Sequence, residues 1–162
     1  MANQRAQIRM TDDEVRAFLE SSRTMTMATM GPSGHPHLVA MWFAFLDGVV
    51  WFETKTKSQK VQNLRRDPRI SCMVEAGDTY DQLQGVLLQG TAAISDDPDA
   101  LRRVGIDVFE RYTGPFTDDL EPMLETMLKG RVAVRVDVEN VASWDHRKLG
   151  MPPMQPGGTT WP

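Results

Sequence analysis

Positive charge is concentrated between residues 55 and 69, where a predicted apolar strand gives way to a short helix. Six basic side chains and one acidic residue, Asp67, give this stretch a net charge of +5: Lys55, Lys57, Lys60, Arg65, Arg66 and Arg69. Thr56 or Ser58 can serve as the N-cap of the helix. Free backbone N–H groups at a helix start, hydroxyl groups and nearby lysines together provide what a bound phosphate requires. A solvated basic helix is the commoner reason for such a run, so on charge alone both interpretations stay open.

The other residue types that could carry out chemistry form no recognisable site. The three histidines, His35, His37 and His146, include no pair at metal-ligand spacing on a helix, so no metal site is expected. Cys72 lies in an apolar run and is predicted to be a buried, unreactive thiol. Neither a nucleophile-elbow serine nor a glycine-rich dinucleotide fingerprint follows a predicted strand. No catalytic residue is therefore assigned, and no motif in the sequence supports a hydrolase or a Rossmann-type nicotinamide-binding protein.

Hydrophobic periodicity places the basic junction within a chain of short strands and a few helices. Helices are predicted over residues 11–22, 98–112 and 118–129, the first from a capping box formed by Thr11 and Glu14. Strands are predicted over residues 24–30, 38–46, 49–52, 70–74, 85–94 and 131–138, with a final short strand that holds Val141 and Trp144. The first three strands are expected to form an antiparallel meander.

The strand predicted over residues 38–46 is apolar on both faces, so core, a ligand or a partner chain must cover both sides. Tryptophans on or beside the strands could also serve as walls for a planar ligand, because aromatic faces stack on conjugated rings. Trp51 is predicted to be core. Trp42 and Trp144 could be core or ligand walls.

One domain accounts for most of the sequence. The chain has 162 residues, of which 41% are hydrophobic and 25% are charged, as in ordinary globular domains. Residues 1–150 are predicted as a single domain and residues 151–162 as an irregular C-terminal tail. Six or seven strands with local connections predict a mainly β fold, a closed or nearly closed antiparallel barrel with helices packed outside it. A doubly wound parallel sheet is the alternative.

The overall charge and the cysteine content restrict the partners and the compartment. The 18 basic and 22 acidic residues give a net charge of −4, which argues against nucleic acid or an anionic membrane as a partner. A single cysteine cannot form an internal disulfide, which fits a reducing cytoplasm. No signal peptide is recognised and no apolar stretch approaches the roughly 20 residues of a membrane span. Neither export nor a membrane anchor is expected.

Between Val49 and Ile70 the sequence resembles the flavin and deazaflavin oxidoreductases of the pyridoxamine-phosphate-oxidase-like superfamily. The resemblance continues through Gly-Asp-Thr-Tyr at 77–80, Gln-Gly-Val at 84–86, Arg-Tyr-Thr-Gly at 111–114 and Ser-Trp-Asp-His-Arg-Lys-Leu-Gly at 143–150. It therefore covers nearly the whole chain. Within the superfamily the sequence is most similar to the actinobacterial branch that uses the deazaflavin coenzyme F-420.

The resemblance implies a split β-barrel of the FMN-binding type with flanking helices, which forms a homodimer with a cofactor site at each end of the interface. The implied cofactor is coenzyme F-420, which carries a phosphodiester and a glutamate tail. FMN is the alternative, although flavin-binding members have a Ser-Arg-Lys triplet where this chain reads Ser58, Gln59 and Lys60. The implied cofactor-binding residues are Val39, Met41 and Phe43 at the ring, Thr54, Lys55, Lys57, Ser58, Gln59 and Lys60 at the phosphate, and Gln84 and Trp144 from the partner chain.

The activity implied by the resemblance is hydride transfer from the reduced deazaflavin to a small, conjugated, electron-poor acceptor of the enone or quinone type. The cofactor performs the difficult step, so the protein needs to supply only binding and orientation. A proton for the product could come from solvent, from Tyr80 or from His37. Two other functions stay open: an FMN-dependent oxidase or reductase of the same fold, and a non-catalytic protein that binds or carries a deazaflavin.

Overall fold

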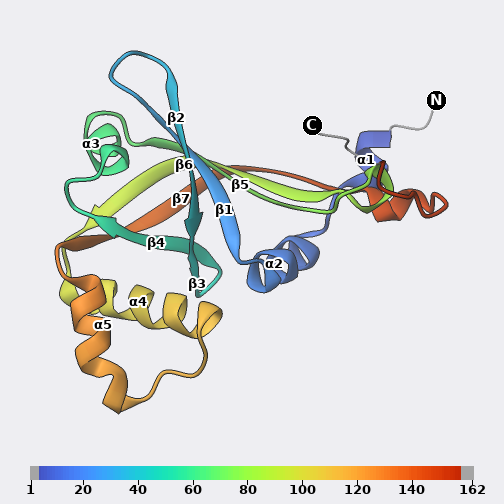
Figure 1. The fold of residues 1–162 in the computed structure, drawn as a ribbon. Coiled ribbons are helices and arrows are strands. Elements are labelled where there is room, and N and C mark those ends of the chain that lie inside the picture. Colours follow the sequence, from blue (N-terminus) through green and yellow to red (C-terminus); the bar gives the residue numbers. More distant parts are fainter. Residues whose placement is uncertain (1–3, 158–162) are drawn as a thin grey trace.

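Seven antiparallel strands form one curled sheet in the computed structural model, which describes residues 4–157 (Figure 1). The order across the sheet is β2-β1-β5-β6-β7-β4-β3. Because β2 and β3 are consecutive in the chain yet occupy opposite edges, the sheet must curl until its two edges meet. This confirms the mainly β, antiparallel barrel and excludes the doubly wound parallel sheet. The strands are β1 (Thr24–Met30), β2 (Pro36–Trp42), β3 (Ala44–Leu46), β4 (Val49–Lys55), β5 (Arg69–Ala76), β6 (Gln84–Ser95) and β7 (Arg131–Asp145).

The single strand predicted over residues 38–46 is wrong, and so is the three-strand meander. β2 ends at Trp42 and pairs only with β1, whereas β3 begins at Ala44 and pairs only with β4. Phe43 carries the chain from one edge of the sheet to the other, and its side chain is fully buried. Its backbone N–H donates to the Tyr112 hydroxyl at 3.2 Å instead of to a neighbouring strand. The run looked like one strand because a crossing through the core is as apolar as a buried strand.

The last two predicted strands are one strand, β7, which pairs with β6 from Ala133 to Asp145. The pairing of the two strands shifts between Gln89 and Gly90, opposite the polar residues 137–140 that separate the two predicted strands. The helix predicted over residues 118–129 is divided into a 3-10 turn, η2 (Asp118–Leu120), and α5 (Glu121–Leu128). A short helix, α1 (Gln4–Ile8), was not predicted. Residues 150–157 hold no helix or strand, and residues 158–162 of the predicted tail lie outside the described residues.

Two of the helices have the N-terminal caps that the sequence predicts. In α2 (Asp12–Ser21) the Thr11 hydroxyl accepts from the Glu14 N–H, and the Glu14 carboxylate accepts from the Thr11 N–H. In α4 (Pro98–Tyr112) the Asp97 carboxylate accepts from two N–H groups of the first turn. Such caps satisfy backbone donors that have no partner inside the helix.

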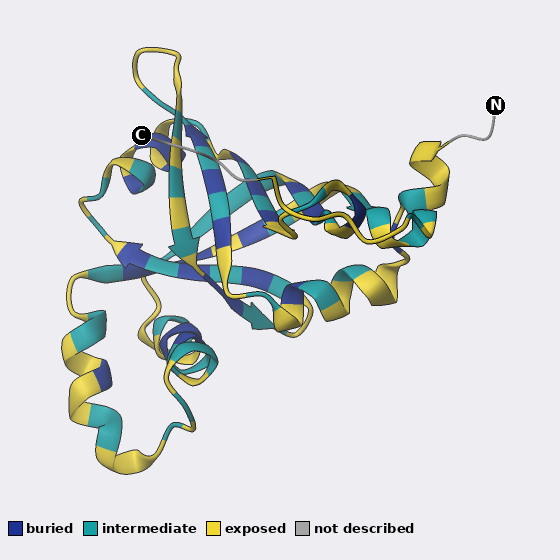
Figure 2. Ribbon diagram, turned by 45° about the vertical axis from the view of Figure 1, so that its right-hand side comes forward, coloured by how far each residue is buried: buried dark blue, intermediate teal, exposed yellow. Residues whose placement is uncertain are grey.

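Hydrophobic side chains fill the inside of the curled sheet, where buried and exposed positions alternate along the strands (Figure 2). Met25, Met27 and Phe52 are almost completely buried there. Leu19 of α2 and Val61 of α3 (Gln59–Arg66) join the same core. A second, smaller core lies where α4 packs against β3, β4 and β7, and α5 in turn packs against α4 (Figure 1). Among the described residues, no helix is long and apolar enough to cross a membrane.

Candidate functional site

The curled sheet is open between β2 and the second half of β4. β3 pairs with β4 only as far as Trp51, so residues 52–55 of β4 have no strand beside them on that side. β2 likewise pairs with β1 alone. A cavity of about 660 Å³, here named the split cavity, lies along these two open edges and is lined by Thr24, Val39, Ala40, Met41, Trp42, Glu53, Thr54, Lys55, Ser58, Lys60, Val108, Met127 and Arg131.

One end of the split cavity is polar and basic. The Lys60 Nζ donates to the Thr54 Oγ1 at 3.2 Å, and the Ser58 Oγ lies 3.4 Å from the same oxygen. Of the two residues predicted as the N-cap of α3, Ser58 holds that position. Its side chain accepts no hydrogen bond from the helix. The N–H groups of the first turn of α3 therefore have no side-chain cap, which is the arrangement that binds anions at helix starts.

Electrostatics at this end favour the arrival of negative charge. Burial, together with the nearby Arg131 guanidinium, lowers the pKa of Lys60, and the Glu53 carboxylate opposes this effect. An anion bound beside Lys60 would offset both causes and stabilise its charged form. A bound anion would therefore raise the pKa of Lys60 back toward its ordinary value.

Sequence reasoning missed two charged residues of this cavity, Arg131 and Glu53. The Arg131 Nη1 lies 2.6 Å from the Glu53 Oε2, and the two side chains are 27% and 11% exposed. They meet because β4 pairs with β7, with Lys55 directly opposite Arg131. The signal that could have revealed them is this strand pairing, which links residues 78 positions apart. Three basic side chains and one acidic side chain therefore line this end of the cavity.

The other residues that line the split cavity are mostly apolar or aromatic. Val39 and Met41 line the cavity from β2, and Val108 and Met127 line it from α4 and α5. Trp42 is 58% exposed and stacks on the Tyr112 ring, with ring centroids 4.2 Å apart and an interplanar angle of 11°. Trp42, for which two interpretations were open, is thus a cavity wall and not core.

The structure brings together six of the residues expected at the cofactor: Val39, Met41, Thr54, Lys55, Ser58 and Lys60 all line the split cavity. Three others do not line it. Phe43 is fully buried in the barrel core, since it carries the chain between the sheet edges, and Lys57 is exposed. Gln59 is also exposed, and its side-chain amide donates to the Asn63 Oδ1 at 2.8 Å.

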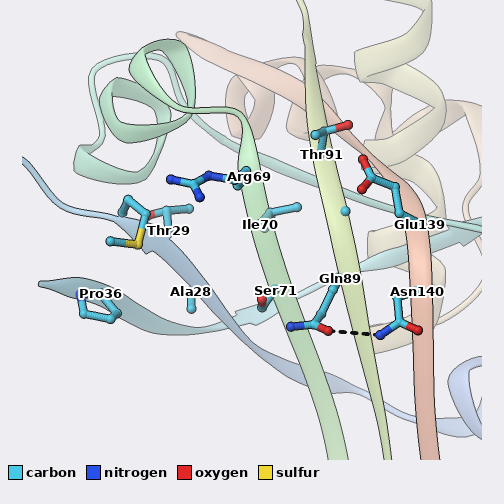
Figure 3. A pocket seen from close by; sticks show the side chains of 12 residues that line it. Ala28, Thr29, Pro36, Arg69, Ile70, Ser71, Gln89, Thr91, Glu139 and Asn140 are labelled. Atoms are coloured by element: carbon cyan, nitrogen blue, oxygen red, sulfur yellow. Dashed lines mark hydrogen bonds between the residues drawn. The ribbon is translucent and has the colours of Figure 1, made fainter. Parts of the chain in front are cut away.

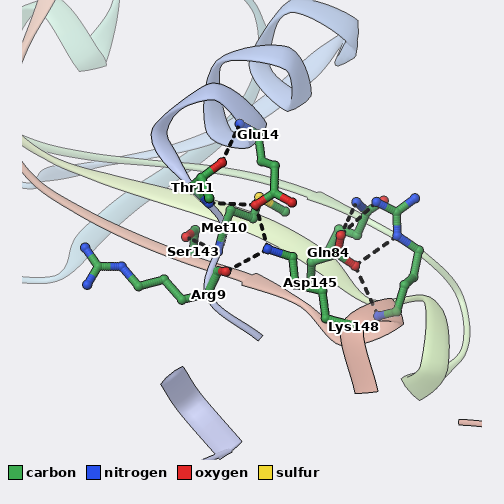
Figure 4. A network of polar contacts seen from close by, with 9 residues as sticks. Arg9, Met10, Thr11, Glu14, Gln84, Ser143, Asp145 and Lys148 are labelled. Atoms are coloured by element: carbon green, nitrogen blue, oxygen red, sulfur yellow. Dashed lines mark hydrogen bonds and ion pairs between the residues drawn. The ribbon is translucent and has the colours of Figure 1, made fainter. Parts of the chain in front are cut away.

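The remaining two expected residues, Gln84 and Trp144, lie at the far end of the β6–β7 strand pair. Gln84 pairs with Asp145, whereas Arg131 begins the other end of β7. Gln84 lines a second cavity of about 660 Å³, beside α2, with Asp145 and Arg147. Its amide lies 3.4 Å from the Asp145 Oδ2 within a polar network at the ends of the chain (Figure 4).

That network fixes the end of the β6–β7 strand pair against the N-terminal segment (Figure 4). The Lys148 Nζ lies 2.5 Å from the Glu14 Oε2 and donates to the Arg9 carbonyl at 2.8 Å. The Met10 N–H donates to the Ser143 hydroxyl at 3.1 Å. These contacts hold η3 (His146–Leu149) and the end of β7, including Trp144, in one arrangement.

A third cavity, of about 530 Å³, lies on the outer face of the sheet (Figure 3). Its polar side chains are largely paired with protein groups: Arg69 binds Asp67 at 2.6 Å, and Asn140 donates to Gln89 at 3.1 Å. No comparable excess of positive charge lies among the described residues that line it. The split cavity is therefore the candidate site.

The other residues considered for chemistry lie away from the split cavity. Cys72 is fully buried, and burial raises its pKa to about 12, which confirms the prediction of an unreactive core thiol. Tyr80 belongs to a 3-10 turn, η1 (Tyr80–Gln82), and its ring packs edge-on against His146 with centroids 4.4 Å apart. His37 is half-buried near the start of β2. Neither proposed proton donor lines the cavity.

Comparison with known proteins extends the resemblance to the whole fold. The family model of pyridoxamine 5'-phosphate oxidase matches residues 11–145. A conserved hypothetical protein from Mycobacterium tuberculosis is 56% identical, with a TM-score of 0.94 over 97% of this chain and 98% of that chain. A protein named F-420 reductase is 27% identical, with a TM-score of 0.61 over 78% of this chain and 94% of that chain.

A heme storage protein from Vibrio cholerae is 16% identical, with a TM-score of 0.62 over 80% of this chain and 92% of that chain. This likeness shows the shared fold alone. No sequence among the curated proteins matches the chain. The family model spans all seven strands of the barrel and the split cavity between β2 and β4. The chain therefore belongs to the pyridoxamine 5'-phosphate oxidase family, whose split-barrel fold it adopts.

Proposed function

We propose that the protein binds coenzyme F-420 in the split cavity and uses it to reduce a conjugated, electron-poor acceptor of the enone or quinone type. The observation that carries this proposal is the basic end of the cavity, where Lys55, Lys60 and Arg131 meet the uncapped start of α3. The likeness to a protein named F-420 reductase, at 27% identity, supports a deazaflavin as the cofactor.

The groups present in the split cavity fit such a cofactor. Two ammonium groups, a guanidinium and the backbone N–H groups of α3 form a donor set suited to a phosphate. The open edges of β2 and β4 offer unpaired backbone N–H and C=O groups, which suit the polar edge of a heterocyclic ring. Val39 and Met41 offer the apolar surface that a planar ring needs.

The chain would contribute binding and orientation to the reaction, while the reduced deazaflavin, when bound, supplies the hydride. Trp42 and Met127, which both line the split cavity, would hold a conjugated acceptor and exclude water from its face. Glu53, the acidic side chain of the cavity wall, is held by Arg131 at the basic end. The proton for the product would therefore come from solvent.

A homodimer belongs to the same proposal, with Gln84 and Trp144 of the second copy completing the site. Within one chain, Arg131 and Trp144 are separated by roughly 40 Å of strand, because a β-strand rises about 3.3 Å per residue. One ligand cannot touch both of them in a single copy. Leu38, on the outer face of β2, is 62% exposed, which supports an interface at this face.

Titration of the purified protein with coenzyme F-420, followed by fluorescence polarisation, tests the binding. The reduced cofactor is then mixed with a panel of quinones and enones, and its oxidation is followed by absorbance. We expect saturable binding and oxidation by at least one acceptor. A protein that binds the cofactor but oxidises it with none would instead be a carrier, and a yellow preparation that keeps its colour through gel filtration would indicate an FMN enzyme.

A further inference from the structure

Glu53 is an acidic side chain on the wall of a cavity end that is otherwise basic. Its carboxylate is only 11% exposed and lies 2.6 Å from the Arg131 guanidinium. Within the split cavity this pair is neutral, so the positive charge that remains unpaired there belongs to Lys55 and Lys60. A partly buried carboxylate is costly unless it is paired, and it weakens any anion site that contains it. Its presence in this position requires a reason.

The charge of the ligand supplies that reason. A phosphate monoester carries about −1.5 to −2 charges near neutral pH, whereas a phosphodiester carries a single charge. Repulsion from a fixed carboxylate grows in proportion to the charge of the ligand, so it penalises a monoester about twice as strongly as a diester. A carboxylate at the cavity wall therefore favours the diester even though it weakens the binding of both.

The first residue of α3 adds nothing that would offset this penalty. Gln59 is neutral, and its amide donates to the Oδ1 of Asn63 at 2.8 Å. Asn63 is fully buried and donates in turn to the Thr29 hydroxyl at 3.0 Å. This chain of hydrogen bonds ties Gln59 to the barrel, so the start of the helix offers backbone N–H groups but no further positive charge.

We propose that Glu53 shifts the preference of the split cavity toward a singly charged phosphodiester and away from a doubly charged phosphate monoester. This inference rests on the proposed function, because it takes the split cavity as the cofactor site. It distinguishes the two cofactors directly, since coenzyme F-420 contains a phosphodiester and FMN a phosphate monoester. Glu53 acts on the phosphate through its charge and holds Arg131 in place.

The test compares the dissociation constants of coenzyme F-420 and FMN for the full-length wild-type protein and for Glu53→Gln, measured by calorimetric titration. Glutamine keeps the shape of the side chain and an acceptor for Arg131 but removes the charge. We expect F-420 binding to tighten about threefold and FMN binding to tighten about tenfold, because the effect scales with the charge of the phosphate group beside Glu53. The control, Glu139→Gln, changes the net charge by the same amount at an exposed position of β7. It should leave the ratio of the F-420 and FMN dissociation constants unchanged.

A double variant, Glu53→Gln with Arg131→Gln, separates charge from shape. It removes one negative and one positive charge, so the ratio of the two dissociation constants should return close to the wild-type value. A ratio that stays as high as in Glu53→Gln would overturn the inference, as would an unchanged ratio in Glu53→Gln itself. Thermal unfolding of each variant checks that the fold is retained.

Failure of the proposed function gives a different result. If the wild-type protein binds neither cofactor but Glu53→Gln acquires FMN binding, the cavity discriminates by phosphate charge and the assignment of F-420 is wrong. If Glu53→Gln tightens the binding of FMN and F-420 by the same factor, the selectivity inferred for Glu53 is wrong, although the split cavity can still be the cofactor site. If neither protein binds FMN at all, the inference also fails.

Discussion

Replacement of Lys60 by methionine should weaken the binding of coenzyme F-420 while leaving the fold intact. Within residues 4–157 the Lys60 Nζ has one hydrogen-bond partner, the Thr54 Oγ1 at 3.2 Å, and it lies half-buried beside the uncapped start of α3. A hydrogen bond to a charged group contributes about 1.5–3 kcal/mol. Since every 1.4 kcal/mol is a factor of ten, the dissociation constant should rise by about 10- to 150-fold.

The assay is calorimetric titration of coenzyme F-420 into wild-type protein, Lys60→Met and the control Arg65→Met. Arg65 is exposed on the same helix, so its replacement removes the same charge without touching the split cavity. The melting temperature of Lys60→Met should stay close to that of the wild type, because methionine keeps the buried part of the side chain. Equal affinities for Lys60→Met and wild type, or an equal loss in Arg65→Met, would refute the assignment of the basic end as the phosphate site.

Three further predictions concern pH, a tight contact and a cap. Because burial and the nearby Arg131 guanidinium lower the pKa of Lys60 below its usual 10.5, the ammonium loses its proton earlier than a free lysine, so F-420 affinity should fall as the pH rises toward that value. Titrations at increasing pH check this, and Lys60→Met should lack this part of the fall. In Gly85→Ala the added Cβ would lie 2.1 Å from the Trp144 ring, so we expect a loss of about 1–3 kcal/mol in thermal unfolding, with Gly157→Ala as a neutral control. Thr11→Ala removes the cap of α2 and should cost about 1 kcal/mol in denaturant unfolding; no loss would contradict the role of the capping box.

Local sequence patterns predicted those parts of the fold that local interactions determine. The Thr11 capping box and the Asp97-Pro98 pair placed the starts of α2 and α4 correctly, because a cap depends on residues within three or four positions. Alternation of buried and exposed residues likewise placed β1 and β6. The run from residue 38 to 46 was misjudged because apolar composition is the same for a buried strand and for a chain crossing the core at Phe43.

The candidate site was predictable where its residues are neighbours in the chain. Thr54, Lys55, Ser58 and Lys60 fall within seven positions, and their charge and hydroxyl groups indicated an anion site. Arg131 could not be found in this way, since only the register of β4 against β7 brings it to Glu53. For Trp42 the sequence left core and ligand wall as alternatives, because the choice depends on the edge position of β2 and on the stacking of Tyr112.

A crystal structure of the protein with coenzyme F-420 bound would show directly whether the split cavity is the cofactor site. We expect the phosphodiester within hydrogen-bond distance of Lys60 and the first N–H groups of α3, with the ring beside Val39 and Met41. We also expect Gln84 and Trp144 of a second copy to close the site. A ligand bound in the cavity beside Arg69 or in that beside Arg147, with the split cavity empty, would refute this assignment.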